Sequence, residues 1–476
     1  MLSRAITIAS QIASIICLTR LLSKETFGLL SFLLLAYATV TTLAQIGLPE
    51  SIYYFFERVA VTAKKNFALL TSKTLFFIGI GASSILIILN YLAPKFGFDV
   101  QGLFFPLILL LLLDLPVTPL PNVLIAIDRT KAAAWFNIVS GLLQFTALVL
   151  PVFLGYPLKI IVICLAIYGA IRFLFGAFLF FKFLPGESSA LPKGILKEQF
   201  HYSIPLGISQ MLWGLNRQLD KYIVAAFLPV AIYAEYTVGS WEIPLIPAIA
   251  YSVASVMMPQ LVSLNLERKT SELLDLWNRS IRKVAIIVLP LTVLFLVIAE
   301  EFIVLMFSEK YIAAAVPFRI YTLIIFQRVA AYSSMLKALG ETKVIIYSAV
   351  YMVVINLLLS IPFVMWLGMS GPPLATLIAN IFTWGYALKK ISNALNVPVA
   401  QVFPFRIYLK TLGVACATGL LMWLLKENLV MGHPAKLFVT VPIFIAGYAL
   451  LASLSKVMSK EDWRGFARSI GIRSAG

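Results

Sequence analysis

The chain has 476 residues, of which 61% are hydrophobic and only 12% are charged. Soluble domains carry about 25% charged residues, so this composition excludes a soluble domain of ordinary size. The formal net charge is +17, but the basic residues lie in short gaps between apolar runs. That pattern is typical of an integral membrane protein and not of a nucleic-acid-binding protein, so we expect no nucleic-acid partner.

The apolar runs, taken in chain order, are long enough to cross a bilayer as helices, which requires about 20 residues each. They predict an all-α membrane protein with about 14 transmembrane helices. The first run is interpreted as a helix and not as a signal peptide, because no cleavage site follows it and the next run begins almost at once. The predicted spans are 2–22, 27–56, 67–92, 103–127, 133–154, 158–181, 199–228, 231–262, 283–305, 315–338, 343–367, 371–391, 408–425 and 435–455.

The distribution of Lys and Arg predicts the orientation of these spans. With the N-terminus inside, about 25 basic residues fall in inner segments and about six in outer ones, which is a decisive bias under the positive-inside rule. The outer residues are Lys24, Lys95, Lys159, Lys310, Lys426 and Lys436. We therefore expect a multi-pass protein of the plasma (inner) membrane with both termini in the cytoplasm.

A polar segment rich in proline, glycine and serine divides the chain and predicts its domains. We expect an N-terminal lobe with the first six helices, a cytoplasmic linker, a C-terminal lobe with the next six, the last two helices with their connecting loop, and a cytoplasmic tail. The predicted boundaries are, in the same order, 1–183, 184–198, 199–391, 392–456 and 457–476.

No residue pattern of an enzyme or a metal site is found in the sequence. The cysteines Cys17, Cys164 and Cys416 lie inside apolar runs without CxxC spacing, and the chain has only two histidines. A phosphate-binding glycine-rich loop with lysine, an HExxH motif and a nucleophile elbow are all missing. We therefore expect no catalytic activity, no metal and no cofactor.

Basic residues inside the predicted spans are the most informative feature, since each costs about 2.5–3.5 kcal/mol at the bilayer centre unless a cavity, a partner or the interface accommodates it. Lys73 is explained by snorkelling, and Arg172 by a buried pair with Asp114. Arg217, Asp220 and Lys221 are three and four residues apart and share a helix face. We interpret this face as a cationic lining for an anionic group, the alternative being a helix end wetted from outside.

The remaining candidates are less clustered. Arg20, Arg319 and Arg328 are candidate substrate-binding cations, with snorkelling as the alternative for the first two and an interhelical partner for the third. The acids Glu50, Asp220, Glu235 and Glu242 are candidates for H⁺ or Na⁺ coupling or gating, and salt bridges to the cations are the equal alternative. Pro244 and Pro247 predict a kink after Glu242.

Three stretches resemble a known family. They are Leu18-Thr-Arg-Leu-Leu-Ser-Lys-Glu-Thr-Phe-Gly28 followed by Gln45-Ile-Gly-Leu-Pro-Glu-Ser51, then Leu215-Asn-Arg-Gln-Leu-Asp-Lys-Tyr222 with Ile232-Tyr-Ala-Glu-Tyr236, and finally Lys337-Ala-Leu-Gly-Glu-Thr-Lys343. They are similar to the polysaccharide-transporter family, the O-antigen flippase type. Its superfamily also holds multidrug extruders and the lipid II flippase.

The resemblance implies two six-helix lobes in a V-shaped arrangement, with the last two helices outside them. It implies that a polyprenyl-diphosphate-linked oligosaccharide is moved from the cytoplasmic to the outer leaflet by alternating access through a central cavity. It further implies membrane lipid and polysaccharide polymerase machinery as partners of a monomeric protein. The basic residues agree with such a cargo, because Arg forks match phosphate oxygens.

Two other functions are compatible with the sequence. An ion-coupled multidrug or cation antiporter of the same superfamily would need the acids Glu50, Glu235 and Glu242 to dominate the cavity. A membrane enzyme acting on the lipid-linked glycan would usually carry its chemistry on a long polar loop, whereas the predicted outer loops are all short.

Overall fold

The computed structural model describes residues 2–184, 189–243, 245–459 and 462. Within these ranges every regular element is a helix, which confirms the predicted all-α fold. The chain forms two compact units, Met1–Thr237 and Val238–Gly476. Residues 185–188 of the predicted linker and most of the predicted tail lie outside the described residues, so the division at 184–198 stays a prediction.

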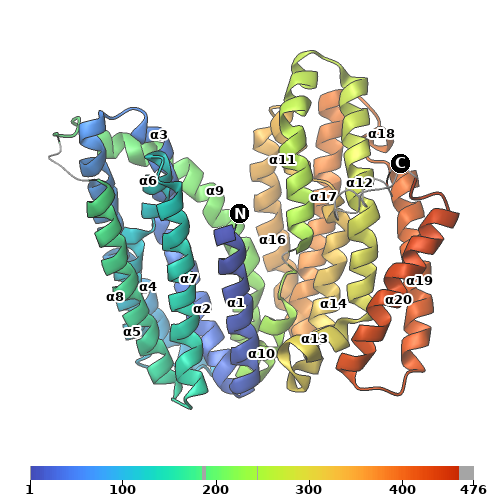
Figure 1. Cartoon of the computed structure of the whole chain (residues 1–476), viewed down its shortest axis with the longest axis horizontal. Coiled ribbons are helices and arrows are strands. Elements are labelled where there is room, and N and C mark those ends of the chain that lie inside the picture. Colours follow the sequence, from blue (N-terminus) through green and yellow to red (C-terminus); the bar gives the residue numbers. More distant parts are fainter. Residues whose placement is uncertain (1, 185–188, 244, 460–461, 463–476) are drawn as a thin grey trace. The chain divides into compact units, whose positions relative to one another are not determined.

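The helices of the first unit follow the predicted apolar runs closely. In Figure 1, α1, α7 and α8 run side by side, and α1 packs against α7, α5 against α8, and α2 against both α4 and α9. The helices are α1 (Leu2–Leu21), α2 (Lys24–Gln45), α3 (Leu48–Phe56), α4 (Lys64–Leu92), α5 (Phe104–Asp114), α6 (Leu120–Ala126), α7 (Thr130–Phe153), α8 (Leu158–Phe183), α9 (Ile195–Phe227) and the first turns of α10 (Val230–Gly239).

A sharp break separates α2 from α3 inside one predicted span. Ile46 and Gly47 adopt left-handed backbone conformations with φ of 46° and 72°, and Pro49 follows in the first turn of α3, where proline is well tolerated. Helix α9 packs directly on this break: a Cβ added to Gly207 would lie 2.4 Å from the carbonyl carbon of Ile46. Glycine is therefore required at both ends of this contact, at Gly47 for its conformation and at Gly207 for space.

The second unit is also built from long helices, with short 3₁₀ segments between some of them. Residues 240–243, which lie between α10 and α11, are not helical, so the helix is interrupted around Glu242, just before the kink that the prolines predicted. Pro247 lies in the first turn of α11, and Pro244 lies outside the described residues. The elements are α11 (Leu245–Leu266), α12 (Thr270–Val297), α13 (Ala299–Phe307), η4 (Glu309–Ala314), α14 (Ala315–Ile324), η5 (Ile325–Val329), α15 (Tyr332–Ala338), α16 (Thr342–Leu367), α17 (Gly371–Leu395), α18 (Val399–Val402), α19 (Phe405–Glu427) and α20 (His433–Leu454).

The last two helices are part of the second unit's core. Helix α19 packs against α12, and α20 packs against α13 and α19. A single buried apolar cluster joins these helices, with Ile286, Val293, Ala415 and Phe444 among its members. Their expected position outside the two six-helix lobes stays a prediction, and the structure shows that they share buried residues with α12 and α13.

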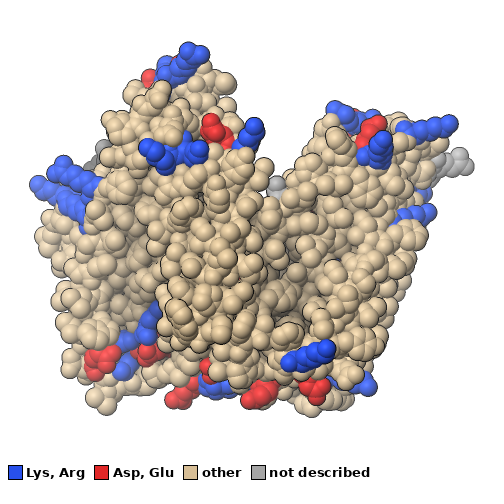
Figure 2. Space-filling view, turned by 180° about the vertical axis from the view of Figure 1, so that it is seen from behind, with Lys and Arg blue, Asp and Glu red and all other residues tan. Residues whose placement is uncertain are grey.

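Many of the described helices have the length and apolarity of membrane spans. Ten stretches qualify, one of which, Thr342–Leu395, has 54 residues, and two shorter apolar helices accompany them. In Figure 2 the visible face of each unit carries most of its charged side chains at its two ends, with a largely uncharged belt between. The protein is therefore a multi-pass membrane protein. The count of about 14 spans, which includes the polar helix α9, stays a prediction that is compatible with this structure.

Candidate functional site

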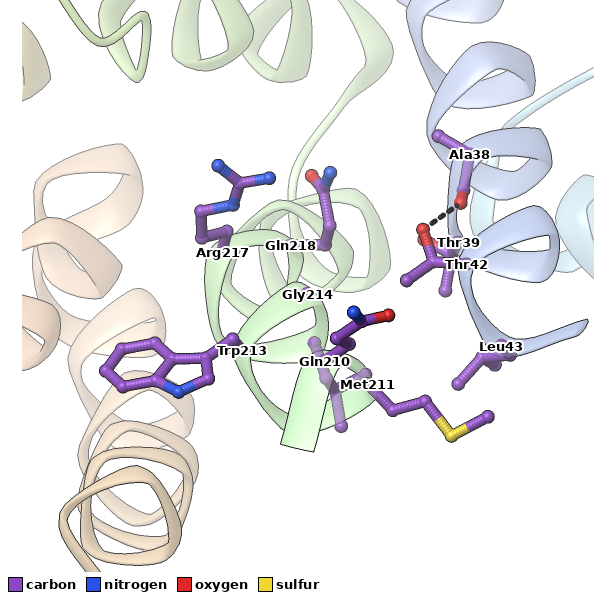
Figure 3. Close-up of a pocket in the computed structure, with 11 residues that line it drawn as sticks. Ala38, Thr39, Thr42, Leu43, Gln210, Met211, Trp213, Gly214, Arg217 and Gln218 are labelled. Atoms are coloured by element: carbon purple, nitrogen blue, oxygen red, sulfur yellow. Dashed lines mark hydrogen bonds between the residues drawn. The ribbon is translucent and has the colours of Figure 1, made fainter. Parts of the chain in front are cut away.

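A cavity of about 430 Å³ lies in the first unit between α2 and α9. The two helices approach closely beside it, because Gly214 has no side chain and an added Cβ would lie 3.1 Å from the Thr42 methyl group. Figure 3 shows the side chains that surround this space. The lining residues are Ala38, Thr39, Thr42 and Leu43 from α2 and Gln210, Met211, Trp213, Gly214, Leu215, Arg217 and Gln218 from α9.

Arg217 is the only charged residue among those that line the cavity. Its side chain is exposed, and among the described residues no carboxylate forms a salt bridge with it. It lies ten positions, or about 15 Å, before the end of α9 at Phe227. In the predicted span 199–228 this is the expected middle of a 30 Å hydrocarbon layer. A cation at that depth is costly unless water or an anion reaches it, and the cavity provides the space for either.

The other polar groups of the lining are amides and hydroxyls. Thr39 and Thr42 donate hydrogen bonds to the carbonyl oxygens of Leu35 and Ala38, at 2.9 and 2.8 Å, so their hydroxyl oxygens keep the capacity to accept. The amide oxygen of Gln218 is buried and has no hydrogen-bond partner within the described residues. Such an orphaned group is stabilised when water or a ligand donates to it.

The structure separates the residues that the sequence grouped on one face of α9. Arg217 borders the cavity, whereas Asp220 is buried at 4% exposure and is hydrogen-bonded to the Tyr236 side chain of α10. The backbone amide of Lys221 donates to the Asp220 carboxylate at 3.0 Å, and Lys221 itself is half-buried. Spacings of three and four put residues near one another, but here neighbouring helices divide the shared face.

Several predicted site residues of the first unit lie elsewhere. Arg20 is exposed in the last turn of α1 and does not line the cavity. Glu235 on α10 forms a salt bridge with Lys24 at the start of α2. Glu50 lies in the first turn of α3, and one of its carboxylate oxygens is buried with no hydrogen-bond partner in the described part of the chain.

The predicted cations of the second unit both have carboxylate partners. Arg319 pairs with Glu300 at 2.9 Å and also donates to the Leu296 carbonyl oxygen. Arg328 pairs with Glu242, which is 86 residues earlier in the chain. The partner that the sequence left open for Arg328 is therefore this glutamate, which lies in the non-helical segment before α11 and not on a helix.

The buried pair between Arg172 and Asp114 is confirmed. The two residues form a salt bridge, and the Tyr37 hydroxyl donates to the second carboxylate oxygen at 2.8 Å. The Arg172 guanidinium also lies over the Phe136 ring, 5.3 Å from its centroid. The pair therefore joins α2, α5 and α8 and leaves no free charge for a ligand.

One ion pair was not predicted. Lys426, which the sequence placed in an outer loop, is only 4% exposed and forms a salt bridge with Glu301, which is 2% exposed. Its ammonium group also donates to the Val297 carbonyl oxygen at 2.9 Å. The burial was not expected because α19 continues to Glu427, two residues beyond the predicted span, and its last turn contacts Val297 and Glu301; the outer position of Lys426 stays a prediction.

Sequence reasoning also missed most of the cavity's lining. Gln210 and Trp213 lie seven and four residues before Arg217, so helical periodicity alone puts all three on one side of α9. Helix α9 is not among the ten stretches apolar enough to span a membrane, and its polar residues are the reason. A polar helix within an otherwise apolar chain was the signal that could have identified these residues.

The comparisons with known proteins agree on the fold. The lipid II flippase MurJ in an inward closed conformation has a TM-score of 0.72 and 16% identity, with 99% of each chain covered. An inward-facing multidrug resistance MATE family transporter of the MOP superfamily has a TM-score of 0.63 and 14% identity, over 82% of this chain and 96% of its own. A MOP superfamily transporter from Pyrococcus furiosus, whose title describes a binding pocket of reverse polarity, has a TM-score of 0.52 and 15% identity, over 83% and 94% of the two chains.

The class of protein is thus a multi-pass α-helical membrane protein with the fold of these flippases and transporters. Residues 17–316 match the family described as "Polysaccharide biosynthesis protein", and the chain belongs to that family. None of the curated protein sequences matches it.

Proposed function

We propose that the chain is a flippase for a lipid-linked oligosaccharide. In this proposal it moves polyprenyl-diphosphate-linked repeat units of a polysaccharide from the cytoplasmic to the outer leaflet by alternating access. The family membership and the transporter fold support this class of function. The observation that carries the proposal is Arg217, a cation without a carboxylate partner in a cavity inside a membrane-spanning unit.

The lining has the chemistry that such a head group requires. A diphosphate is anionic, and the planar guanidinium of Arg217 can donate two parallel hydrogen bonds to its oxygens. In a low-dielectric layer this attraction is far stronger than in water. Gln210 and Gln218 supply amides for sugar hydroxyls, and the indole of Trp213 supplies a flat apolar surface for the C–H face of a sugar ring.

The size of the cavity also suits part of this cargo. Ligand pockets generally measure about 300–1,000 Å³, and the volume of about 430 Å³ falls in the lower part of that range. It suits a diphosphate with an adjoining sugar, while the polyprenyl chain remains in the bilayer, where its burial costs nothing.

The orientation and the driving force belong to the same proposal. We expect the chain to lie in the inner membrane with both termini in the cytoplasm, as the positive-inside rule predicts. Glu50 is our candidate for H⁺ or Na⁺ coupling, because its carboxylate lies beside the break between α2 and α3 and has an unpartnered buried oxygen.

The test is Arg217→Ala, compared with Arg217→Lys and with the matched control Arg406→Ala. Arg406 is an exposed arginine at the start of α19. Losing a hydrogen bond to a charged group costs about 1.5–3 kcal/mol, so transport of a labelled polyprenyl-diphosphate oligosaccharide into vesicles should fall roughly tenfold to a hundredfold in Arg217→Ala. The lysine variant should retain part of the activity, and the control all of it. Transport at the wild-type rate by Arg217→Ala would refute the proposed role of this residue.

A drug or cation antiporter requires acids that are free to bind a cation, and two of the three acids that it would need are already paired. Glu235 and Glu242 already form salt bridges with Lys24 and Arg328. The only charged residue of the α2–α9 cavity is a cation. Drug-resistance assays on cells that express the chain distinguish the two functions, since a flippase should confer no resistance.

A further inference from the structure

A second cavity of the first unit, of about 590 Å³, opens between α4, α6 and α8 and differs sharply in character from the first. Apart from Lys73 and Ser72, its lining is apolar, and aromatic rings dominate it. The rings belong to Phe76 and Phe77 of α4 and to Phe173, Phe180 and Phe181 of α8.

The chain path explains why a cavity forms here. Helix α5 ends at Asp114, and Pro116 lies in the 3₁₀ turn η3 (Leu115–Val117) before α6 begins. Opposite this turn, α8 carries Gly176, where an added Cβ would lie 2.6 Å from a methyl carbon of Val117. The η3 turn interrupts the helix on one side of the cavity. Because Gly176 has no side chain, α8 approaches this turn closely, and the phenylalanine rings line the space beside the contact.

Lys73 is the single charge in this lining. Its side chain is exposed, and no carboxylate or aromatic ring contacts its ammonium group in the described ranges. Asp114, which precedes the η3 turn, is not available as a partner, because Arg172 and the Tyr37 hydroxyl already bind it. The snorkelling expected for Lys73 directs its ammonium toward the membrane interface. Lipid phosphates lie there, so an anion that itself brings apolar chains stabilises the ammonium.

A further basic group borders the same aromatic wall, and another lies close to it in the chain. The Lys65 ammonium lies 6.0 Å from the ring centroid of Phe181, which lines the cavity, and Lys182 directly follows Phe181 in the last turn of α8. Lys65 precedes Lys73 by eight residues, or about 12 Å along α4. The positive charges therefore lie toward the start of α4 and the end of α8, while Phe76 and Phe77 continue the wall in the direction of the apolar belt.

We propose that this cavity binds one anionic glycerophospholipid, with its phosphate on Lys73 and an acyl chain along the phenylalanine rings. A phosphodiester carries one negative charge, which one unpaired ammonium neutralises. Basic pockets between membrane helices on the cytoplasmic side bind anionic head groups in this way, and that is the side predicted for the start of α4. The site is separate from the α2–α9 cavity and is independent of the transported cargo.

The experiment measures lipid binding to the full-length protein, purified in detergent, by native mass spectrometry. Phosphatidylglycerol, which is anionic, and phosphatidylcholine, which is zwitterionic, are titrated separately. The wild type should bind the first more tightly. Lys73→Met keeps the apolar stem but removes the charge, and should weaken phosphatidylglycerol binding about fivefold and phosphatidylcholine binding by less, because the choline ammonium already neutralises the phosphate of that lipid. Lys73→Arg should retain the preference, and so should the control Lys95→Met, an exposed lysine in the 3₁₀ turn that follows α4.

A second variant tests the apolar wall apart from the charge. Ala177 lines the cavity, and Ala177→Phe should fill it and weaken binding of both lipids. Equal phosphatidylglycerol binding by Lys73→Met and Lys95→Met would overturn the proposal, and so would unchanged binding by Ala177→Phe. Displacement of phosphatidylglycerol by an equimolar polyprenyl phosphate would overturn the assignment to a glycerophospholipid.

Discussion

The Glu301–Lys426 pair permits a quantitative test of the second unit. Both side chains are almost completely buried, so removing one leaves the other as an uncompensated charge. Breaking a buried ion pair in this way costs about 3–5 kcal/mol, whereas replacing both partners with apolar residues is often neutral or stabilising. We therefore expect Glu301→Leu to destabilise the protein strongly, and the double variant Glu301→Leu/Lys426→Met to recover most of the loss.

The size of the effect depends on what remains around the lysine. After Glu301→Leu, the Lys426 ammonium still donates to the Val297 carbonyl oxygen at 2.9 Å, which moves the expected cost toward 3 kcal/mol. With about 2–4 °C per kcal/mol for a unit of this size, a cost of 3–5 kcal/mol corresponds to a fall of the melting temperature by roughly 6–20 °C.

The assay is thermal unfolding of the purified protein in detergent, followed by the fraction that remains monodisperse in size-exclusion chromatography. Lys436→Met is the control, because Lys436 is an exposed lysine of α20. A double variant as unstable as Glu301→Leu would refute the reasoning, since it would mean that the loss does not come from a stranded charge.

Two further predictions concern stability. Gly207→Ala should lower the melting temperature, because the added Cβ would overlap the Ile46 backbone. Gly413→Ala is the control, since the space around Gly413 is open, and it should leave the melting temperature unchanged or raise it. Equal effects of the two substitutions in thermal unfolding would refute the packing of α9 on the break between α2 and α3. Arg328→Ala should lower the free energy of unfolding by about 1–3 kcal/mol, because it leaves the Glu242 carboxylate without its partner in a membrane protein; an unchanged free energy in denaturant unfolding would contradict this expectation.

The positions of the helices could be predicted because each one depends on the residues of its own segment. A run of apolar residues must be helical in a bilayer to satisfy its own backbone hydrogen bonds, and the predicted span 343–367 accordingly matches α16 at Thr342–Leu367. The break at Ile46–Gly47 was not predicted, although proline and glycine stand there. Whether such residues interrupt a helix depends on what packs against them, here the Gly207 region of α9.

The candidate site could be predicted only in part. Arg217 was identified because a cation in an apolar segment is costly unless water, an anion or a partner stabilises it. Arg172, which has a carboxylate partner, was identified by the same rule. The partners of Arg328 and Lys426 could not be found, since Glu242 and Glu301 are 86 and 125 residues away from them. Tertiary packing decides which acid pairs with which base, and no short sequence pattern indicates pairs between residues so far apart in the chain.

The separation of Glu301 and Lys426 along the chain affects how the protein is made. The ribosome adds the 125 residues between them at about 5–20 residues per second, so the carboxylate remains without its lysine for roughly 6–25 s of synthesis. A chain that terminates before α19 never receives that lysine. In a chain without α19 and α20 the Glu301 carboxylate therefore stays without its lysine. We expect such truncated products to be degraded faster than the full-length protein in a pulse-chase experiment.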